Sequence, residues 1–205
     1  MPGPEWDAIV LSAGASARWG GRPKALLPIG RETALERVVR LARAAGAART
    51  AVVVGRHADE LRPLVSRDVE VLANPQWERG RTGSVQVGLR WAEGAEGVLL
   101  WPVDHPFVDG ETAAQLLATA RRDALALWTL PTFEGRGGHP VAIRREAFGE
   151  VLDLDPARPL RTVLRRLGVQ VARVPVRDPG VIDSSDTPDE YRDGLARWTV
   201  RERQG

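Results

Sequence analysis

The chain of 205 residues contains no cysteine and has only one methionine and one tyrosine. The absence of cysteine excludes disulfide bonds, thiolate nucleophiles and cysteine-ligated zinc. No apolar run approaches the roughly 20 residues that a membrane-spanning helix needs. The N-terminal stretch MPGPEWDAIV lacks the charged and apolar regions of a secretory signal. We therefore expect a cytoplasmic protein without a membrane partner.

Lysine is almost missing as well. Of the 29 lysine and arginine residues, 28 are arginine, and Lys24 is the single lysine. The basic residues are scattered among 27 acidic ones, and the formal net charge at pH 7 is only +2. The basic residues do not cluster into a positively charged patch of the kind that binds nucleic acid, so we expect no nucleic-acid partner. Lys24 stands out as a position at which this arginine-rich chain keeps a different cation.

Short apolar segments alternate with helical patterns. We predict strands over residues 7–12, 50–55, 69–73, 97–103, 124–130, 139–143 and 169–176, and helices over 33–46, 82–94, 109–122, 160–168 and 187–198. Several strand segments are continuously apolar, which is typical of parallel strands buried on both faces. The pattern predicts an α/β fold with three layers and a doubly wound, mostly parallel sheet.

No internal repeat or low-complexity linker divides the chain. We therefore expect one domain over residues 1–205. The glycine- and proline-rich segment 131–140 is interpreted as a loop over the functional site, because it lies between two predicted strands and offers no helical or strand pattern of its own.

The loop after the first predicted strand is rich in small residues. It reads SAGASARWGGRPK from Ser12 to Lys24. Small residues let backbone N–H groups approach a phosphate chain closely, and ligands of open parallel sheets bind at the carboxyl ends of the strands. A Walker A loop is excluded because no lysine follows Gly20, and a dinucleotide fingerprint is excluded because Ser16 stands where glycine is required.

The whole stretch, L-S-A-G-x-S-x-R-x-G-x-x-P-K, resembles the signature of a family of nucleotidyltransferases. This family includes the sugar-phosphate nucleotidyltransferases and the MobA-like molybdenum-cofactor nucleotidyltransferases. The resemblance implies a Rossmann-like nucleotidyltransferase fold, similar to that of glycosyltransferases of type A. It also implies that the loop wraps a nucleoside triphosphate and that two cations stabilise charge at the α-phosphate and the leaving pyrophosphate. The implied nucleotide-binding residues of the loop are Leu11, Ser12, Ala13, Gly14, Arg18 and Lys24.

The shape of the lysine side chain gives a reason for Lys24. An arginine side chain ends in a wide planar fork, whereas lysine is a compact point charge on a thin stem. A cation that must reach a phosphate oxygen through a narrow loop is therefore not easily replaced by a guanidinium group. The alternative is that one lysine simply remains without a functional role.

Two acidic segments are candidates for a metal site. Asp104 ends the apolar run VLLWPVD, so its carboxylate should face the ligand crevice. Magnesium is usually held by one or two carboxylates together with phosphate oxygens. Asp104 matches the metal-binding VDxP step of the family, although it could instead cap the following turn. The segment VIDSSDTPDEY resembles the family's DIDTPEDL ending, which implies Asp183 as the second ligand of Mg²⁺, with Asp186 as the alternative.

The segment ANPQWERGRTGSV resembles the NPxWxxGxxxS element of the molybdenum-cofactor cytidylyltransferase branch. That resemblance implies nucleotide contacts by Asn74, Gly83 and Ser84. Asn74 could instead form an Asx turn before Pro75. The glycine and the serine are expected at a helix N-terminus, where backbone N–H groups favour anions.

Two short sequence elements that contain histidine are expected to face the acceptor substrate. The elements DHP and GGHPV resemble those of the same branch and imply acceptor contacts by His105, Gly138 and His139. A histidine beside phosphates can donate a hydrogen bond without acting as an acid or base. His139 could also be a purely structural histidine, and His57 belongs to none of these motifs.

Together, the motifs imply a Mg²⁺-dependent nucleotidyltransferase with Arg18, Lys24 and Asp104 as its catalytic residues. It would move a nucleoside monophosphate, with CMP favoured, from a nucleoside triphosphate to a phosphate-bearing acceptor, with molybdopterin favoured, and release pyrophosphate. The alternatives are a sugar-phosphate acceptor, a guanylyltransferase that uses GTP, and a non-catalytic nucleotide-binding protein with a molybdoenzyme as its partner.

Overall fold

The computed structural model describes residues 5–203, except for the side chain of Val169. The strands of its large sheet are β1 (Trp6–Ser12), β4 (Thr50–Val54), β5 (Glu70–Ala73), β6 (Gly97–Pro102), β7 (Trp128–Phe133), β8 (Arg136–Gly137), β9 (Val141–Arg144) and β10 (Val171–Pro175). Their order is β10-β7-β9-β6-β1-β4-β5, with β8 paired to β7. The strands β2 (Pro28–Ile29) and β3 (Glu32–Thr33) form a separate small ribbon.

The large sheet is mostly parallel. β1 pairs in parallel with β4 and β6, β4 pairs in parallel with β5, and β7 pairs in parallel with β10. Only β9 and the short β8 run antiparallel to their neighbours in the described part of the chain. The predicted fold class, a doubly wound α/β sheet with mostly parallel strands, is confirmed.

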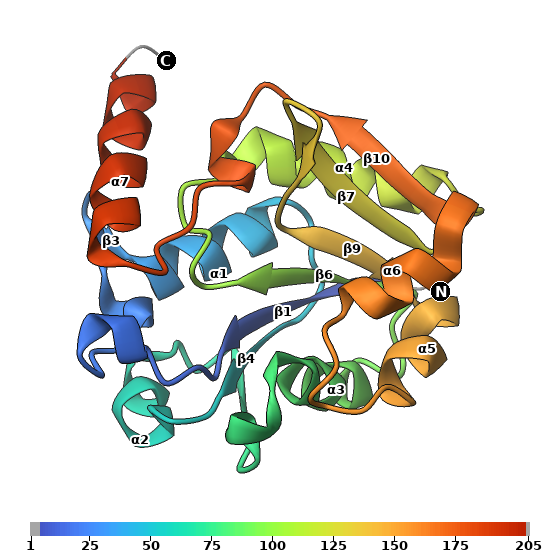
Figure 1. Cartoon of the computed structure of the whole chain (residues 1–205), viewed down its shortest axis with the longest axis horizontal. Coiled ribbons are helices and arrows are strands. Elements are labelled where there is room, and N and C mark those ends of the chain that lie inside the picture. The colour runs from blue at the N-terminus through green and yellow to red at the C-terminus, as the bar shows by residue number, and fades with distance from the viewer. Residues whose placement is uncertain (1–4, 204–205) are drawn as a thin grey trace.

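Helices cover both faces of the sheet (Figure 1). One layer contains α1 (Ala34–Ala44) and α4 (Gly110–Arg122), and the other contains α3 (Arg81–Trp91), α5 (Phe148–Leu152) and α6 (Arg161–Leu167). Strand β1 serves both cores, since Ala8 and Val10 pack into one and Ile9 and Leu11 into the other. Successive side chains of a strand point to opposite faces, so a strand covered on both sides must be apolar throughout.

The predicted helix starts are confirmed at two places. Thr33 before α1 and Thr187 before α7 (Pro188–Glu202) both form capping boxes, with Glu36 and Glu190 respectively. Each threonine hydroxyl accepts a hydrogen bond from a backbone N–H group in the first helical turn. Without this bond, that N–H group would have no partner within the helix. The sequence gives no signal for the short α2 (Ala58–Leu61). None of the helices in residues 5–203 is long and apolar enough to cross a membrane.

The region around residues 124–140 differs from the prediction. The Asp123 carboxylate accepts hydrogen bonds from the N–H groups of Leu125 and Ala126, so this apolar stretch folds into a turn and β7 begins only at Trp128. The expected loop 131–140 contains the β7–β8 hairpin instead. Pro131 has no N–H to donate, but its carbonyl accepts from the Gly138 N–H at 2.9 Å, and the strand continues through it.

Candidate active site

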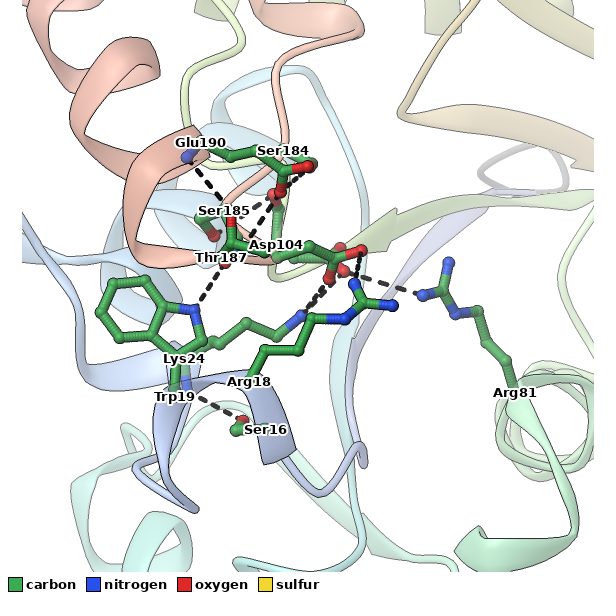
Figure 2. A network of polar contacts seen from close by, with 11 residues as sticks. Ser16, Arg18, Trp19, Lys24, Arg81, Asp104, Ser184, Ser185, Thr187 and Glu190 are labelled. Carbon is green, nitrogen blue, oxygen red and sulfur yellow. Dashed lines mark hydrogen bonds and ion pairs between the residues drawn. The ribbon is translucent and has the colours of Figure 1, made fainter.

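The loop after β1 crosses the carboxyl edge of the sheet and is fastened at two points (Figure 2). The Ser16 hydroxyl accepts a hydrogen bond from the Lys24 backbone N–H at 3.2 Å, across a short 3₁₀ turn at Ala17–Trp19. The Trp19 indole N–H donates to the Ser185 carbonyl at 2.9 Å. These bonds hold the loop against the segment before α7, which lies far away in the sequence.

Lys24 joins two carboxylates at this edge. Its Nζ lies 3.1 Å from Asp104 Oδ2 and 2.5 Å from Asp186 Oδ1, and its side chain is only 15% exposed. On the outer side, Arg18 Nη1 lies 3.3 Å from Asp186 Oδ2. From the start of α3, Arg81 Nη2 lies 3.7 Å from Asp104 Oδ2, the oxygen that Lys24 also contacts. The predicted catalytic residues therefore come together in a single charged cluster (Figure 2).

Asp104 is the buried centre of this cluster. Burial alone raises the pKa of its carboxyl group, but the neighbouring imidazole of His105 and the charges of Lys24 and Arg81 outweigh that effect and hold the pKa below its ordinary value. The Asp104 carbonyl accepts from the Ser185 N–H at 2.8 Å. Asp104 is thus an ionised carboxylate whose own backbone also positions the segment that carries Asp186.

The cluster has the donor set for a divalent cation. Oδ1 of Asp104 is buried and has no hydrogen-bond partner in the described part of the chain. A buried carboxylate oxygen without a donor is unfavourable unless something else pairs with it. Asp104 and Asp186 would hold Mg²⁺ together with phosphate oxygens, the usual arrangement for this ion. Residues 5–203 contain no group of three or more histidine and acidic side chains suited to a metal. Phosphate oxygens of a bound nucleotide would therefore have to complete the coordination of the cation.

The contacts of the two candidates for the second carboxylate favour Asp186 over Asp183. The two oxygens of Asp183 accept hydrogen bonds from Arg197 Nε at 3.1 Å and Nη2 at 2.8 Å, which ties Asp183 to α7. Its backbone N–H closes a turn onto the Pro179 carbonyl. This turn, followed by the bond from Ser185 to Asp104, directs Asp183 toward the helix and Asp186 toward Lys24. The alternative, Asp186, therefore replaces Asp183 as the candidate ligand.

This correction leads to a paired test. We expect Asp186→Asn to weaken Mn²⁺ binding in the presence of nucleotide by about tenfold or more, because one charged ligand is lost. The matched variant Asp183→Asn should leave Mn²⁺ affinity within about twofold, since Asp183 acts only on α7. Isothermal titration calorimetry measures both affinities. Equal losses in the two variants would contradict the assignment of Asp186.

A first cavity of about 140 Å³ lies beside the cluster. As predicted, its lining includes Leu11, Ser12, Ala13, Gly14, Lys24, Ser84 and Asp104. Arg18 is not among the lining residues but reaches the site through Asp186. Three residues that were not predicted as site residues, His57, Trp77 and Arg81, also line this cavity. Trp77 and Arg81 lie within the NPxWxxGxxxS element, but only the fold brings them, and His57, to the β1 loop.

Asn74 and Gly83 lie behind the cavity rather than in its lining. Asn74 Nδ2 donates to the Ser84 hydroxyl at 2.9 Å, and its Oδ1 accepts from the Gln76 N–H at 3.0 Å. The bond from the Gln76 N–H to Asn74 Oδ1 forms the Asx turn that was the alternative to a nucleotide contact for Asn74. Since Asn74 is 5% exposed, its amide is engaged within the protein and positions Ser84, which does face the cavity.

The residues expected on the acceptor side gather around a second cavity, of about 490 Å³, which Gly138 and His139 line. Gly138 is required there, because a Cβ atom at this position would lie 2.3 Å from the Val181 carbonyl oxygen. The His139 N–H donates to the same carbonyl at 2.8 Å. His105 does not line the cavity, but its ring packs against that of His139, with 4.6 Å between the ring centroids.

Burial disfavours the charged form of both of these histidines. Burial, together with the neighbouring ring of His105, lowers the pKa of His139 from 6.5 to about 3, and burial also lowers the pKa of His105. Nδ1 of each ring is buried without a hydrogen-bond partner among the described residues. The pair therefore offers neutral hydrogen-bonding groups, and not positive charge, to a ligand.

The lowered pKa of His139 predicts how stability depends on pH. Below pH 6.5 the unfolded chain protonates this residue while the folded protein does not until about pH 3. The free energy of unfolding should therefore fall with decreasing pH in this window, by up to about 1.4 kcal/mol per pH unit for this group. Urea unfolding between pH 7 and pH 5, without divalent metal, measures the slope. We expect His139→Gln to show a shallower slope, and an unchanged slope would refute the prediction.

Comparison of the amino-acid sequence with known proteins identifies the family of this chain. The sequence model of the MobA-like NTP transferase domain matches residues 8–171. A molybdenum cofactor guanylyltransferase from Acidiphilium cryptum is 31% identical over 182 residues, which cover 85% of this chain and 87% of that protein. The bifunctional protein GlmU from Xanthobacter autotrophicus is 39% identical over 155 residues, which cover 67% of this chain. The match covers only 34% of that GlmU, so this chain corresponds to about a third of its length.

The fold is also found in solved structures. Rv0371c from Mycobacterium tuberculosis H37Rv superimposes with a TM-score of 0.84 and 27% identity, covering 96% of this chain and 100% of that one. A manganese complex of Rv0371c, at 24% identity, superimposes with a TM-score of 0.73 over 94% of this chain and 98% of that one. Since the family match spans most of the chain and includes the loop, Asp104 and the strands that support them, this protein belongs to the MobA-like NTP transferase family, a family of nucleotidyltransferases.

Proposed function

We propose that this protein transfers a nucleoside monophosphate, with CMP favoured, from a nucleoside triphosphate to a phosphate-bearing acceptor, with molybdopterin favoured, and releases pyrophosphate. The observation that carries the proposal is the position of Lys24, whose Nζ lies between Asp104 and Asp186 beside the cavity of the β1 loop. The similarity to a molybdenum cofactor guanylyltransferase along nearly the whole chain supports molybdopterin as the acceptor.

The loop residues would bind the triphosphate. Small side chains at Ala13 and Gly14 leave room for phosphates near the backbone, and Ser84 faces the same cavity. Lys24 and Arg18, which contact the two carboxylates, would turn to the phosphate oxygens and stabilise negative charge as pyrophosphate leaves. The released carboxylates of Asp104 and Asp186 would hold Mg²⁺, which supplies further charge neutralisation when bound. The manganese complex of the related Rv0371c supports a divalent cation here.

The acceptor would approach from the second cavity. A phosphate monoester is already anionic, so the attack needs no protein nucleophile, and the uncharged His105 and His139 would serve only as hydrogen-bonding groups. His105 follows Asp104 in the chain and packs against His139, which lines the second cavity, and this supports an acceptor site adjoining the nucleotide site. The enzyme would thus contribute positioning and charge, with both substrates held in one orientation.

The choice of base is the finer part of the proposal. The favoured CMP transfer rests on the NPxW element, whose Asn74 positions Ser84. The relative from Acidiphilium cryptum is a guanylyltransferase, which favours GTP as the second candidate.

Pyrophosphate release tests the function. The purified protein would be incubated with each common ribonucleoside triphosphate, Mg²⁺ or Mn²⁺, and molybdopterin or a hexose 1-phosphate. We expect release with CTP and molybdopterin together, and little with either alone. Turnover only with GTP would make the protein a guanylyltransferase, and turnover only with the hexose phosphate would overturn the molybdopterin assignment. Tight nucleotide binding without turnover would favour a nucleotide-binding protein for molybdoenzyme assembly.

A further inference from the structure

Arg81 occupies an unusual place between the two cavities. It is the one described residue that lines both the cavity beside the β1 loop and the cavity beside His139. Figure 2 shows its side chain reaching toward Asp104 from α3, whereas Lys24 and Arg18 come from the β1 loop. Its Nη2 is 3.7 Å from Asp104 Oδ2, a longer contact than the 3.1 Å from Lys24, and its side chain is 61% exposed. The guanidinium is therefore weakly held and has room to reorient.

The backbone beneath Arg81 is rigidly placed. Gly80 has φ = 135°, and a Cβ atom there would lie 2.3 Å from the Pro156 carbonyl oxygen. The Thr82 hydroxyl donates to the Arg158 carbonyl at 2.6 Å. The start of α3 is thus docked on the segment between α5 and α6, which forms one wall of the second cavity. A flexible side chain on a rigid backbone is suited to binding a ligand without movement of the fold.

The chemistry of the transfer requires a cation at this place. In an in-line displacement the acceptor oxygen attacks the α-phosphorus opposite to the departing pyrophosphate. Lys24 and Arg18 come from the β1 loop, whereas Arg81 comes from α3 and also lines the second cavity, so an acceptor that attacks from the second cavity would meet Arg81. Two phosphate groups repel each other as they approach. A guanidinium can bind phosphate oxygens through two parallel N–H donors, which both neutralises and orients the group.

We propose that Arg81 binds the phosphate group of the acceptor at the junction of the two cavities and thereby selects for phosphate-bearing acceptors. This inference rests on the proposed function, which identifies the bound phosphate group as part of the acceptor substrate. On binding, Arg81 moves from Asp104 Oδ2 to the acceptor phosphate. The body of the acceptor then lies against the second cavity, whose walls include Leu100, Trp128, Leu130 and Val141.

The environment of the second cavity suits a ring next to the phosphate. The four wall residues just named are apolar, so a ring without many hydroxyl groups would bury its surface there without leaving polar groups unpaired. Phenyl phosphate, a phosphate monoester with a flat apolar ring, is therefore a suitable probe.

The test is the binding of phenyl phosphate to the full chain saturated with Mg²⁺ and a CTP analogue that has a methylene bridge between its α- and β-phosphates. Isothermal titration calorimetry would compare the wild type with Arg81→Met, Arg81→Lys and the control Arg90→Met, which changes an exposed arginine on the same helix. We expect Arg81→Met to weaken phenyl phosphate binding by about 10- to 100-fold. Arg81→Lys should restore part of the affinity, and Arg90→Met should leave it unchanged.

The affinity for the CTP analogue separates the possible roles of Arg81. It should stay within about twofold in every variant, because Lys24 and Arg18 hold the triphosphate. Lack of phenyl phosphate binding by the wild type, equal binding by Arg81→Met, or an equal loss of nucleotide affinity would each overturn the inference. With an acceptor that turns over, Arg81→Met should raise the acceptor KM more than it lowers kcat. Binding of phenyl phosphate that depends on Arg81, without turnover of any acceptor, would support this site and reject the proposed transferase function.

Discussion

Replacing Lys24 by arginine is expected to lower kcat by about tenfold or more, and replacing it by methionine should lower kcat by about 100- to 1000-fold. The Lys24 side chain is 15% exposed, and its Nζ lies 3.1 Å from Asp104 Oδ2 and 2.5 Å from Asp186 Oδ1. A guanidinium keeps the charge, but its planar fork is wider than an ammonium group, and it would have to fit where the Lys24 Nζ contacts both carboxylates beside the loop that Ser16 closes. The position therefore requires a compact cation.

Steady-state pyrophosphate release measures this effect, with the exposed Arg22→Lys in the same loop as the matched control. The control should keep its activity, since Arg22 lies outside the charged cluster. Thermal unfolding of each variant shows whether the protein remains folded. A Lys24→Arg variant with a near-normal rate would reject the steric explanation and leave the charge alone as the relevant property.

The second large effect is expected for Asp104→Asn. The substitution removes the buried negative charge that faces Lys24, Arg81 and the proposed metal position. We expect kcat to fall by about 100- to 1000-fold and the concentration of Mg²⁺ for half-maximal activity to rise, because an amide is a poor ligand for this ion. The fold should persist, since the backbone carbonyl of residue 104, and not its carboxylate, bonds to Ser185.

Metal titrations of activity and circular dichroism test the two parts of this prediction separately. Asp153→Asn, an exposed acid on the far end of α5, is a control for the loss of one negative charge. An Asp104→Asn protein that fails to fold would assign Asp104 a structural role in its turn. Normal activity with an unchanged metal requirement would exclude Asp104 as the metal ligand.

Much of the fold and part of the site follow from local sequence patterns. The continuous apolar run of β1 requires a strand covered on both faces, and Thr33 and Thr187 with their glutamates specify helix starts within single turns. The small residues of the loop, Lys24 and Asp104 could be placed at the carboxyl ends of strands, because the direction of a parallel strand decides which edge its following loop occupies. These features depend on neighbours within a few residues, so the sequence alone determines them.

Other features depend on contacts between distant segments. The sequence favoured Asp183 over Asp186 as the second metal ligand. Only the bond of Ser185 to the Asp104 carbonyl, together with the pairing of Asp183 with Arg197, turns Asp186 toward Lys24. Arg81 occupies a variable position of the NPxWxxGxxxS element, and its proposed role emerges because it lines two cavities at the start of α3. In an irregular segment no hydrogen-bond ladder sets the direction of a side chain, so packing against remote parts of the chain decides it.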